Sequence, residues 1–162
     1  DIVNDISGGN LDPDMFETVS KHKVTYILMH MRGSPKNMMS KTDYENVTKD
    51  VCKYFSERID KAKSFGINDI IIDPGFGFSK TTQQNYELFN NLEFFKEFQR
   101  PIIVGISRKS MIYKILNTTP EKALNGSSVL HTISLMKGAN ILRTHDVKEA
   151  LECVKIVSQL NG

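Results

Sequence analysis

With 162 residues, the chain can bury a substantial core, and its length is that of one domain. Apolar residues make up 40% of it and charged residues 25%, which is ordinary for a soluble globular protein. The net charge of +2 arises from interspersed Lys and Glu without a basic block, so nothing indicates nucleic-acid binding. No apolar run approaches the roughly 20 residues of a membrane span, and no signal peptide is visible, so we expect no membrane partner.

Two features bear on location and completeness. Cys52 and Cys153 lie in segments with helical patterns and lack metal-ligand spacing, so we expect reduced core residues of a cytoplasmic protein. The chain opens on Asp1, directly in a strand pattern and without an initiator Met, which leads us to expect a truncated sequence.

Five short apolar runs alternate with longer amphipathic segments. Each run is continuous, as expected for strands that are buried on both faces of a parallel sheet. The predicted strands are Asp1–Ile6, Val24–Met29, Asp69–Asp73, Pro101–Gly105 and Asn140–Leu142.

The segments between the strands have helical spacing. One helix is predicted from Pro13 to Lys21 and another from Gln83 to Phe98. A third has Thr42 as N-cap, with Glu45 completing a capping box, and ends at Gly66. Its buried face is predicted to hold Val47, Val51, Tyr54, Phe55, Ile59 and Ala62.

Two more helices are predicted near the end of the chain, from Pro120 to Gly138 and from about Val147 onward. The first is expected to bury Leu124, Val129, Leu130, Ile133 and Leu135. The second is expected to bury Ala150, Leu151, Val154, Ile156 and Val157.

This alternation predicts an α/β fold with a parallel sheet and right-handed crossovers. A doubly wound sheet would fit the rhythm, but it collects its site at one switch point, and no Gly-x-Gly-x-x-Gly turn is present. Here every strand ends in polar residues, which favours a TIM (β/α)₈ barrel. Such barrels run to about 250 residues, so we expect only the last five β/α units in this chain, with roughly 90 residues absent.

The first polar motif, residues 4–9 (Asn-Asp-Ile-Ser-Gly-Gly), ends the opening strand. Asn4 offers a donor and an acceptor, which suits the edge of a heterocycle, and the glycines let the backbone approach a ligand. A turn closed by Asx hydrogen bonds is the alternative, and the motif alone favours it.

A second motif begins at the end of the next strand. Met29 is unbranched and polarizable, so it is suited to cover one face of a flat ring, although a plain core methionine explains it equally well. His30 is most simply a buried, hydrogen-bonded histidine, and we assign it no catalytic role.

The third motif is residues 73–80 (Asp-Pro-Gly-Phe-Gly-Phe-Ser-Lys). Asp73 follows an apolar strand, where a carboxylate must be paired or used. It can accept two parallel N–H bonds from an amidine-like edge such as that of a pterin, and the glycine-rich turn would let Phe78 reach over an aromatic substrate. An Asp that only caps the next turn is the alternative.

The fourth motif, residues 105–110 (Gly-Ile-Ser-Arg-Lys-Ser), leads from a strand into a helix and forms an anion-friendly corner, with a solvated basic turn as the alternative. Near the end, Arg143 and His145 occupy alternate positions of a strand, so both are expected to point to one side. Arg binds phosphate bidentately and His adds a hydrogen bond or a charge. An Arg–Asp structural ion pair is the alternative.

In this order and at this spacing, the motifs at 4–9, 73–78, 107–110 and 143–147 resemble those of the dihydropteroate synthases. Each motif alone is weak, but together they are specific, and the resemblance covers essentially the whole chain. It implies that residues 1–162 are the C-terminal part, strands 4–8, of a single pterin-binding barrel domain. The family condenses p-aminobenzoate with 6-hydroxymethyl-7,8-dihydropterin diphosphate, giving 7,8-dihydropteroate and pyrophosphate in folate biosynthesis, and sulfonamides compete with p-aminobenzoate.

The resemblance also implies roles for single residues. Pterin contacts would come from Asn4, Met29, Asp73, Gly105 and Lys109. The p-aminobenzoate pocket would be lined by Lys109, Phe78 and Ser110. The pyrophosphate ligands would be Arg143 and His145, with Asn4 nearby, and Ser107, Arg108 and Lys109 would be further anion ligands. Lys109, Arg143 and His145 would be the catalytic residues. Arg143 and His145 would lower the barrier by stabilising the leaving pyrophosphate, so the reaction would need no protein nucleophile.

Two departures from the family pattern affect the expected activity. Ser79 stands where the family usually has Gly. The strands that the resemblance implies to be missing would supply an Asn that helps to place Mg²⁺, an Asp that contacts the pterin, and a Ser-Thr-Arg-Pro loop. We therefore expect Mg²⁺ as cofactor with its principal ligand outside this sequence, an inactive fragment on its own, and a homodimer as the parent assembly.

Two further functions are compatible with the resemblance. A pterin-binding methyltransferase domain that uses methyltetrahydrofolate would share the barrel and the Asn and Asp at the pterin edge, but its substrate has no pyrophosphate for the anion ligands. A truncated, non-catalytic pterin-binding fragment is the other.

Overall fold

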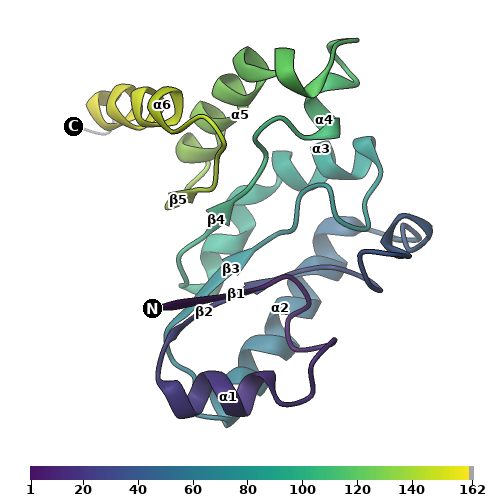
Figure 1. Ribbon diagram of the computed structural model, residues 1–162, viewed down its shortest axis with the longest axis vertical. Helices are drawn as coiled ribbons and strands as arrows, with labels where there is room; N and C mark the ends of the chain where they lie inside the picture. Colours follow the sequence, from purple (N-terminus) through teal and green to yellow (C-terminus); the bar gives the residue numbers. More distant parts are fainter. Residues whose placement is uncertain (161–162) are drawn as a thin grey trace.

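The computed structural model describes residues 1–160, which form five strands with helices between them (Figure 1). The strands are β1 (Ile2–Asp5), β2 (Thr25–Met29), β3 (Ile70–Asp73), β4 (Ile103–Val104) and β5 (Ile141–Leu142). The α-helices are α1 (Met15–His22), α2 (Val47–Ser64), α3 (Thr82–Asn90), α4 (Ser110–Tyr113), α5 (Leu124–Met136) and α6 (Val147–Leu160). Short 3₁₀ helices cover Met38–Ser40, Leu92–Phe98 and Pro120–Lys122. Each predicted strand is confirmed, with slightly shorter ends.

The strands lie side by side in sequence order and are all parallel. β1 pairs with β2, β2 with β3, and β4 with β5. A parallel bridge between Ile72 and Ile102 joins β3 to β4. Because this order does not reverse within the described chain, it lacks the switch point at which doubly wound folds bind nucleotides. The predicted α/β fold with a parallel sheet is confirmed.

The two faces of the strands have different neighbours, because successive side chains point to opposite sides. On one face, Tyr26, Leu28 and Ile72 belong to the main core, which they share with residues of the helices. The other face holds a separate cluster made only of strand residues: Ile27, Ile71, Ile103 and Ile141. Residues two positions further along these strands continue this second face at the carboxyl end of the sheet, and there the polar residues gather.

Helix α2 packs as its sequence predicts but begins later. The predicted face is buried at Val47, Val51, Phe55, Ile59 and Ala62, and Tyr54 is partly buried against the core. The predicted N-cap Thr42 is wrong: Asn46 caps the helix, and its side chain accepts a hydrogen bond from the Lys49 N–H. The carbonyl oxygen of Thr42 instead accepts a hydrogen bond from Gln84 at 2.8 Å, a tertiary contact that the local capping pattern does not reveal.

The predicted helix from Gln83 to Phe98 is two elements. Thr81 and Gln84 form a capping box at the start of α3, and the α-helix ends at Asn90. The chain continues as a 3₁₀ helix, and the side chain of Asn91, at the junction, donates to Thr48 Oγ1 at 3.1 Å. The first helix starts at Met15, two residues after the predicted Pro13.

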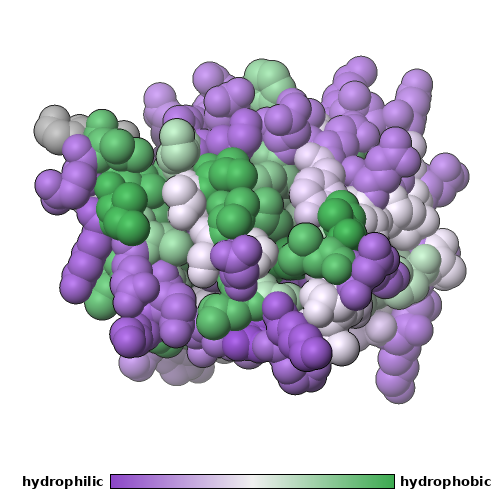
Figure 2. Space-filling view, turned by 90° about the horizontal axis from the view of Figure 1, so that it is seen from above, coloured by the Kyte–Doolittle hydropathy of each residue, from purple (hydrophilic) through white to green (hydrophobic). Residues whose placement is uncertain are grey.

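The buried faces predicted for the last two helices are partly wrong. Leu130, Ala150 and Val157 are buried, but several predicted core residues are about half exposed or more: Val129 (50%), Leu151 (50%) and Ile156 (62%), with Val154 at 37%. Buried positions are taken instead by Ser127, His131, Ser134 and Cys153. α5 is apolar around much of its circumference, so its periodicity does not single out the stripe that faces inward. Figure 2 shows hydrophobic residues on the face that α5 and α6 present at the top of Figure 1.

None of the helices within residues 1–160 has the length and the hydropathy that crossing a membrane requires. Cys52, in α2, and Cys153, in α6, are both free thiols, as predicted.

Candidate active site

The loop after β3 places a carboxylate at the carboxyl end of the sheet. Asp73 ends β3 and pairs in register with Met29 of β2, so both side chains lie on the face away from the main core. Gly75 has a φ of +70°, and a Cβ there would lie 2.0 Å from the carbonyl oxygen of His30, so the turn needs glycine. This turn brings the Gly75 N–H to 2.8 Å from Asp73 Oδ1, which holds one carboxylate oxygen and leaves the other for a ligand.

Three cations lie near Asp73. The pKa of this carboxyl is raised, because the effect of burial outweighs the opposing effects of the Gly75 N–H and of the charges of Lys109, Lys80 and Arg143. The cations thus favour the ionised form that accepts hydrogen bonds. A ligand edge with two parallel N–H donors would complete the hydrogen bonding of the carboxylate.

Lys109 extends from the loop after β4 to the loop after β3. Its Nζ donates to the carbonyl oxygen of Phe76 and lies 4.8 Å from the centre of the Phe78 ring. Burial lowers the pKa of Lys109 to about 8, against the opposing effect of Asp73 and with a further decrease from Arg143. Lys109 therefore joins two loops with a charge that titrates near neutral pH.

A cavity of about 120 Å³ opens between the loops after β4 and β5. Its lining residues are Gly105, Ser107, Lys109, Arg143, Thr144 and His145, all but Thr144 predicted as site residues. The lining combines a guanidinium, an ammonium, an imidazole and two hydroxyls without a carboxylate. This composition suits an anion with several oxygen atoms, such as a phosphate or diphosphate.

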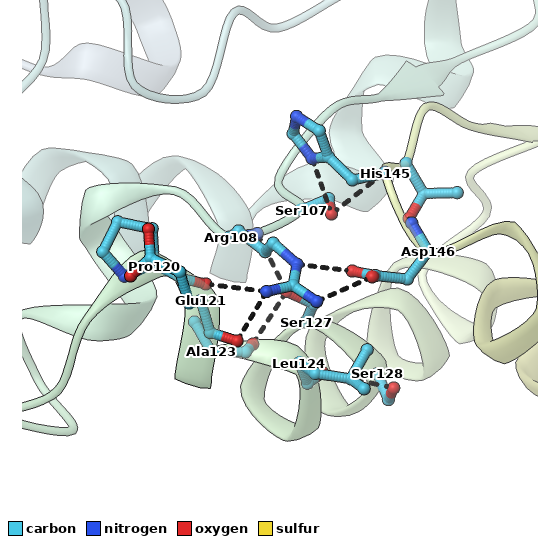
Figure 3. Close-up of polar contacts among 11 residues, drawn as sticks. Ser107, Arg108, Pro120, Glu121, Ala123, Leu124, Ser127, Ser128, His145 and Asp146 are labelled. Carbon is cyan, nitrogen blue, oxygen red and sulfur yellow. Dashed lines mark hydrogen bonds and ion pairs between the residues drawn. The ribbon is translucent and has the colours of Figure 1, made fainter.

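His145 is oriented by Ser107, as Figure 3 shows. The His145 backbone N–H donates to Ser107 Oγ at 3.2 Å, and His145 Nδ1 lies 3.0 Å from the same oxygen. The Ser107 hydroxyl has one donor and two acceptor positions, so it can bind both the His145 backbone N–H and Nδ1 and hold the imidazole with Nε2 turned away from Ser107. A buried serine thus holds an exposed imidazole in a defined orientation.

Arg108 does not contribute to the anion-binding group, contrary to the basic corner predicted at residues 107–109. Its Nε and Nη2 bind the two oxygens of Asp146 at 2.8 and 2.7 Å, and Nη1 donates to the carbonyl oxygens of Pro120 and Glu121 at 3.1 and 2.6 Å (Figure 3). This is the Arg–Asp ion pair expected as an alternative for the end of the chain, formed by Arg108 and not by Arg143. It fastens the loop after β5, which carries His145, to the loop after β4.

The remaining predicted site residues lie around this arrangement. Asn4 in β1 is exposed and pairs with Ile27, on the same face as Met29. Ser110 is the first residue of α4, next to Lys109. Arg143 and His145 both line the cavity, but the prediction that they belong to a strand is wrong, because β5 ends at Leu142.

The loop after β1 is organised as the structural alternative predicts. Asp5 is buried and accepts hydrogen bonds from the Ser7 N–H at 2.8 Å, the Ser7 hydroxyl at 2.7 Å and the Tyr26 hydroxyl at 2.6 Å. Asp5 therefore shapes the loop. Of Asn4 and Asp5, only Asn4 is available to a ligand.

Sequence reasoning missed Lys80. Its ammonium is buried and lies 3.0 Å from Nδ1 of His30, which is a buried, bonded histidine as predicted. The signal in the sequence is a lysine directly after a glycine-rich turn, but its burial depends on the packing of the loops after β2 and β3.

Metal ligands are few in this part of the molecule. Residues 1–160 contain no group of three or more His, Cys, Asp or Glu that could hold a metal ion. Mg²⁺ is usually bound through one or two carboxylates and the phosphates of a substrate, which does not require such a cluster.

Comparison with known proteins places this site in a family. Residues 1–145 match the model of the pterin binding enzymes. The chain belongs to that family. It is 40% identical over 158 residues to the dihydropteroate synthase of Escherichia coli strain K12, an alignment that covers 96% of this chain and 56% of that enzyme.

Solved structures of dihydropteroate synthases are similar to this chain over nearly its whole length. The Yersinia pestis dihydropteroate synthase in a sulfonamide drug complex superposes with a TM-score of 0.95 at 38% identity and covers 99% of this chain and 59% of that one. The Thermus thermophilus enzyme in complex with 4-aminobenzoate gives a TM-score of 0.94 at 31% identity and covers 99% of this chain and 66% of that one. The chain thus spans little more than half the length of the curated relatives that it matches.

Proposed function

We propose that the chain forms the pterin- and pyrophosphate-binding side of a dihydropteroate synthase, with its five strands as the last five units of a (β/α)₈ barrel. The enzyme would join p-aminobenzoate to 6-hydroxymethyl-7,8-dihydropterin diphosphate and release pyrophosphate. The observation that carries the proposal is the placement of a carboxylate and an anion pocket at one end of the sheet, linked by Lys109.

The carboxylate end fits the pterin. Asp73 keeps one oxygen for a ligand and has cations that favour its ionised form. The 2-amino group and ring N–H of a pterin present two parallel donors, which match a carboxylate. Met29, which is in register with Asp73, is placed to cover the ring, and Asn4 on β1 would add a polar contact on the same face.

The cavity fits the leaving group. Arg143 would bind the diphosphate with two N–H donors and His145 would donate through Nε2, oriented by Ser107. As the carbon–oxygen bond between the pterin methylene and the diphosphate breaks, negative charge develops on the leaving oxygens. Donors already directed at those oxygens stabilise this charge. The arylamine nitrogen then attacks the cationic carbon to form the carbon–nitrogen bond, and the nitrogen loses one proton to the released pyrophosphate or to solvent.

Lys109 and Phe78 would receive the second substrate. The Lys109 ammonium lies over the Phe78 ring, so the two side chains form a charged and an aromatic wall within reach of the anion pocket. Ser110, at the start of α4, would extend this wall. A bound Mg²⁺ would supply further charge neutralisation for the diphosphate, with its principal ligand outside this sequence.

Product formation tests this function. The protein, expressed from its complete gene, is incubated with the pterin diphosphate and p-aminobenzoate, and pyrophosphate and dihydropteroate are both quantified. We expect stoichiometric release that requires both substrates. Pterin binding without any release would indicate a non-catalytic pterin-binding protein, and methyl transfer from methyltetrahydrofolate would indicate the methyltransferase alternative, against which the anion pocket argues.

We also propose a homodimer in the cytoplasm. Support comes from the exposed apolar side chains on α5 and α6, such as Val129 and Ile156, which a second copy could cover (Figure 2). Sedimentation should give a dimer that Val129→Glu dissociates and that Lys53→Glu, on the exposed side of α2, leaves intact. A monomeric wild-type protein would remove this part of the proposal.

A further inference from the structure

Apart from its charge near Asp73, the buried amine of Lys80 has no role in the function proposed above. Lys80 is 2% exposed, and within residues 1–160 it forms no salt bridge. Its Nζ lies 2.9 Å from the carbonyl oxygen of Gly75, 3.0 Å from that of Phe78 and 3.0 Å from Nδ1 of His30. Three donors thus meet three neutral acceptors, which satisfies the ammonium without a counter-ion in direct contact.

The acceptors belong to the segments that shape the substrate site. Gly75 and Phe78 enclose the turn between Asp73 and the aromatic wall, so bonds to both carbonyl oxygens fix the turn from its buried side. Burial lowers the pKa of His30 well below its ordinary value, with the Lys80 charge acting in the same direction. A neutral His30 accepts at Nδ1, and its ring lies edge-on to Tyr54 with centroids 4.8 Å apart.

The neighbouring Ser79 strengthens this link between loops. Ser79 is fully buried with a φ of +47°, and its hydroxyl accepts from the Arg32 N–H at 2.9 Å and lies 3.2 Å from the Tyr44 hydroxyl. Residues 79 and 80 therefore attach the loop after β3 to the loop after β2 at two adjacent points.

Burying a lysine ammonium costs desolvation free energy, so a lysine is expected at such a position only where its charge or its three donors have a role. Burial lowers the pKa of Lys80 to about 7, and the charge of Asp73 opposes this decrease. In its protonated form, which predominates below about pH 7, Lys80 interacts with the substrate-binding carboxylate through space, while its donors bind the turn that follows that carboxylate.

We propose that Lys80 is a positioning residue, which holds the turn of residues 73–78 so that Asp73 and Phe78 meet the substrates. This inference rests on the proposed pterin site. Lys80 does not touch the substrate itself, and it has no bond to the residues of the anion cavity. Its loss should therefore affect pterin recognition and leave anion recognition intact.

The test compares two ligands by calorimetry in the protein expressed from its complete gene: bare 6-hydroxymethylpterin and inorganic pyrophosphate. Lys80→Met, which keeps the length but removes the donors, should weaken pterin binding at least tenfold and change pyrophosphate binding less than twofold. Lys80→Gln, which keeps two donors, should give an intermediate loss for the pterin. Ile59→Ala, a buried change in α2, controls for general destabilisation and should leave both affinities unchanged.

A double-mutant cycle measures the coupling between Lys80 and Asp73 in pterin binding, which a lysine with a purely structural role would not show. In the Asp73→Asn background, Lys80→Met should weaken the pterin further by less than threefold, because its effect acts through that carboxylate. Equal weakening of both ligands, additive losses, or unchanged pterin affinity in a folded Lys80→Met protein would overturn the inference. If Lys80→Met does not fold, Lys80→Gln decides alone: a loss of threefold or more supports the inference and unchanged affinity overturns it. Wild-type protein that binds no pterin would overturn the proposed function. Wild-type protein that binds pterin, together with one of the contrary results for Lys80, would overturn only the inference about Lys80.

Discussion

Replacing Asp73 by Asn tests the pterin site most directly. The oxygen of the new amide could keep the 2.8 Å bond from the Gly75 N–H, but the amide nitrogen would then stand where Oδ2 of the carboxylate faces the ligand. An acceptor is exchanged for a donor opposite the donors of the pterin, and the charge that attracts them is lost. Removing one partner of a buried charged hydrogen bond costs about 2–5 kcal/mol. At about 1.4 kcal/mol per factor of ten, the Kd for the pterin should rise between roughly 30-fold and several thousand-fold.

The assay is calorimetric titration of 6-hydroxymethylpterin into wild-type and variant protein. Asp69 provides a matched control, because it lies just before β3, at the opposite end of the strand, where it is exposed and bonded to Thr25. Asp69→Asn should leave the Kd unchanged. A folded Asp73→Asn protein that binds pterin as tightly as the wild type would refute the assignment of Asp73 to the ligand.

The site and the core support three further predictions. Arg143→Ala should weaken the pterin diphosphate far more than bare hydroxymethylpterin in competition titrations, because only the former has phosphates to lose; equal weakening of both would make Arg143 structural. Because the pKa of Lys109 is lowered to about 8, its ammonium is lost as the pH rises through that value, so kcat/KM should fall above about pH 8. In Lys109→Arg, whose side chain stays charged, that decline should be absent, and a persistent decline would assign it to another group. Phe55→Ala, at a fully buried ring with edge contacts to Phe95 at 5.7 Å, should lower the free energy of unfolding in urea by about 3–5 kcal/mol, and a change below about 1 kcal/mol would contradict the packing described.

The candidate site was largely accessible to sequence reasoning because parallel strands all direct their carboxyl ends to one edge. The ends of β3, β4 and β5 alone predict that Asp73, Lys109 and Arg143 lie close together at the carboxyl end of the sheet. In the structure they do. The partners of these residues were not accessible. Arg108 was counted among the anion-binding residues, whereas its guanidinium is bound to Asp146, 38 positions further along the chain.

Local pattern by itself determined the strands, the parallel sheet and the buried face of α2, since continuous apolar runs and helical spacing reflect burial that any compact packing must provide. Only the tertiary structure decided which of several equally plausible local options is used. In the fold, Asn46 caps α2 in place of Thr42, whose backbone carbonyl accepts a hydrogen bond from Gln84, and Val129 is exposed although its position in α5 is apolar. The tertiary structure also buries Lys80, whose acceptors come from two loops that adjoin only in the fold. Periodicity encodes how much of a segment is buried, whereas the identity of its neighbours depends on contacts between residues far apart in the chain.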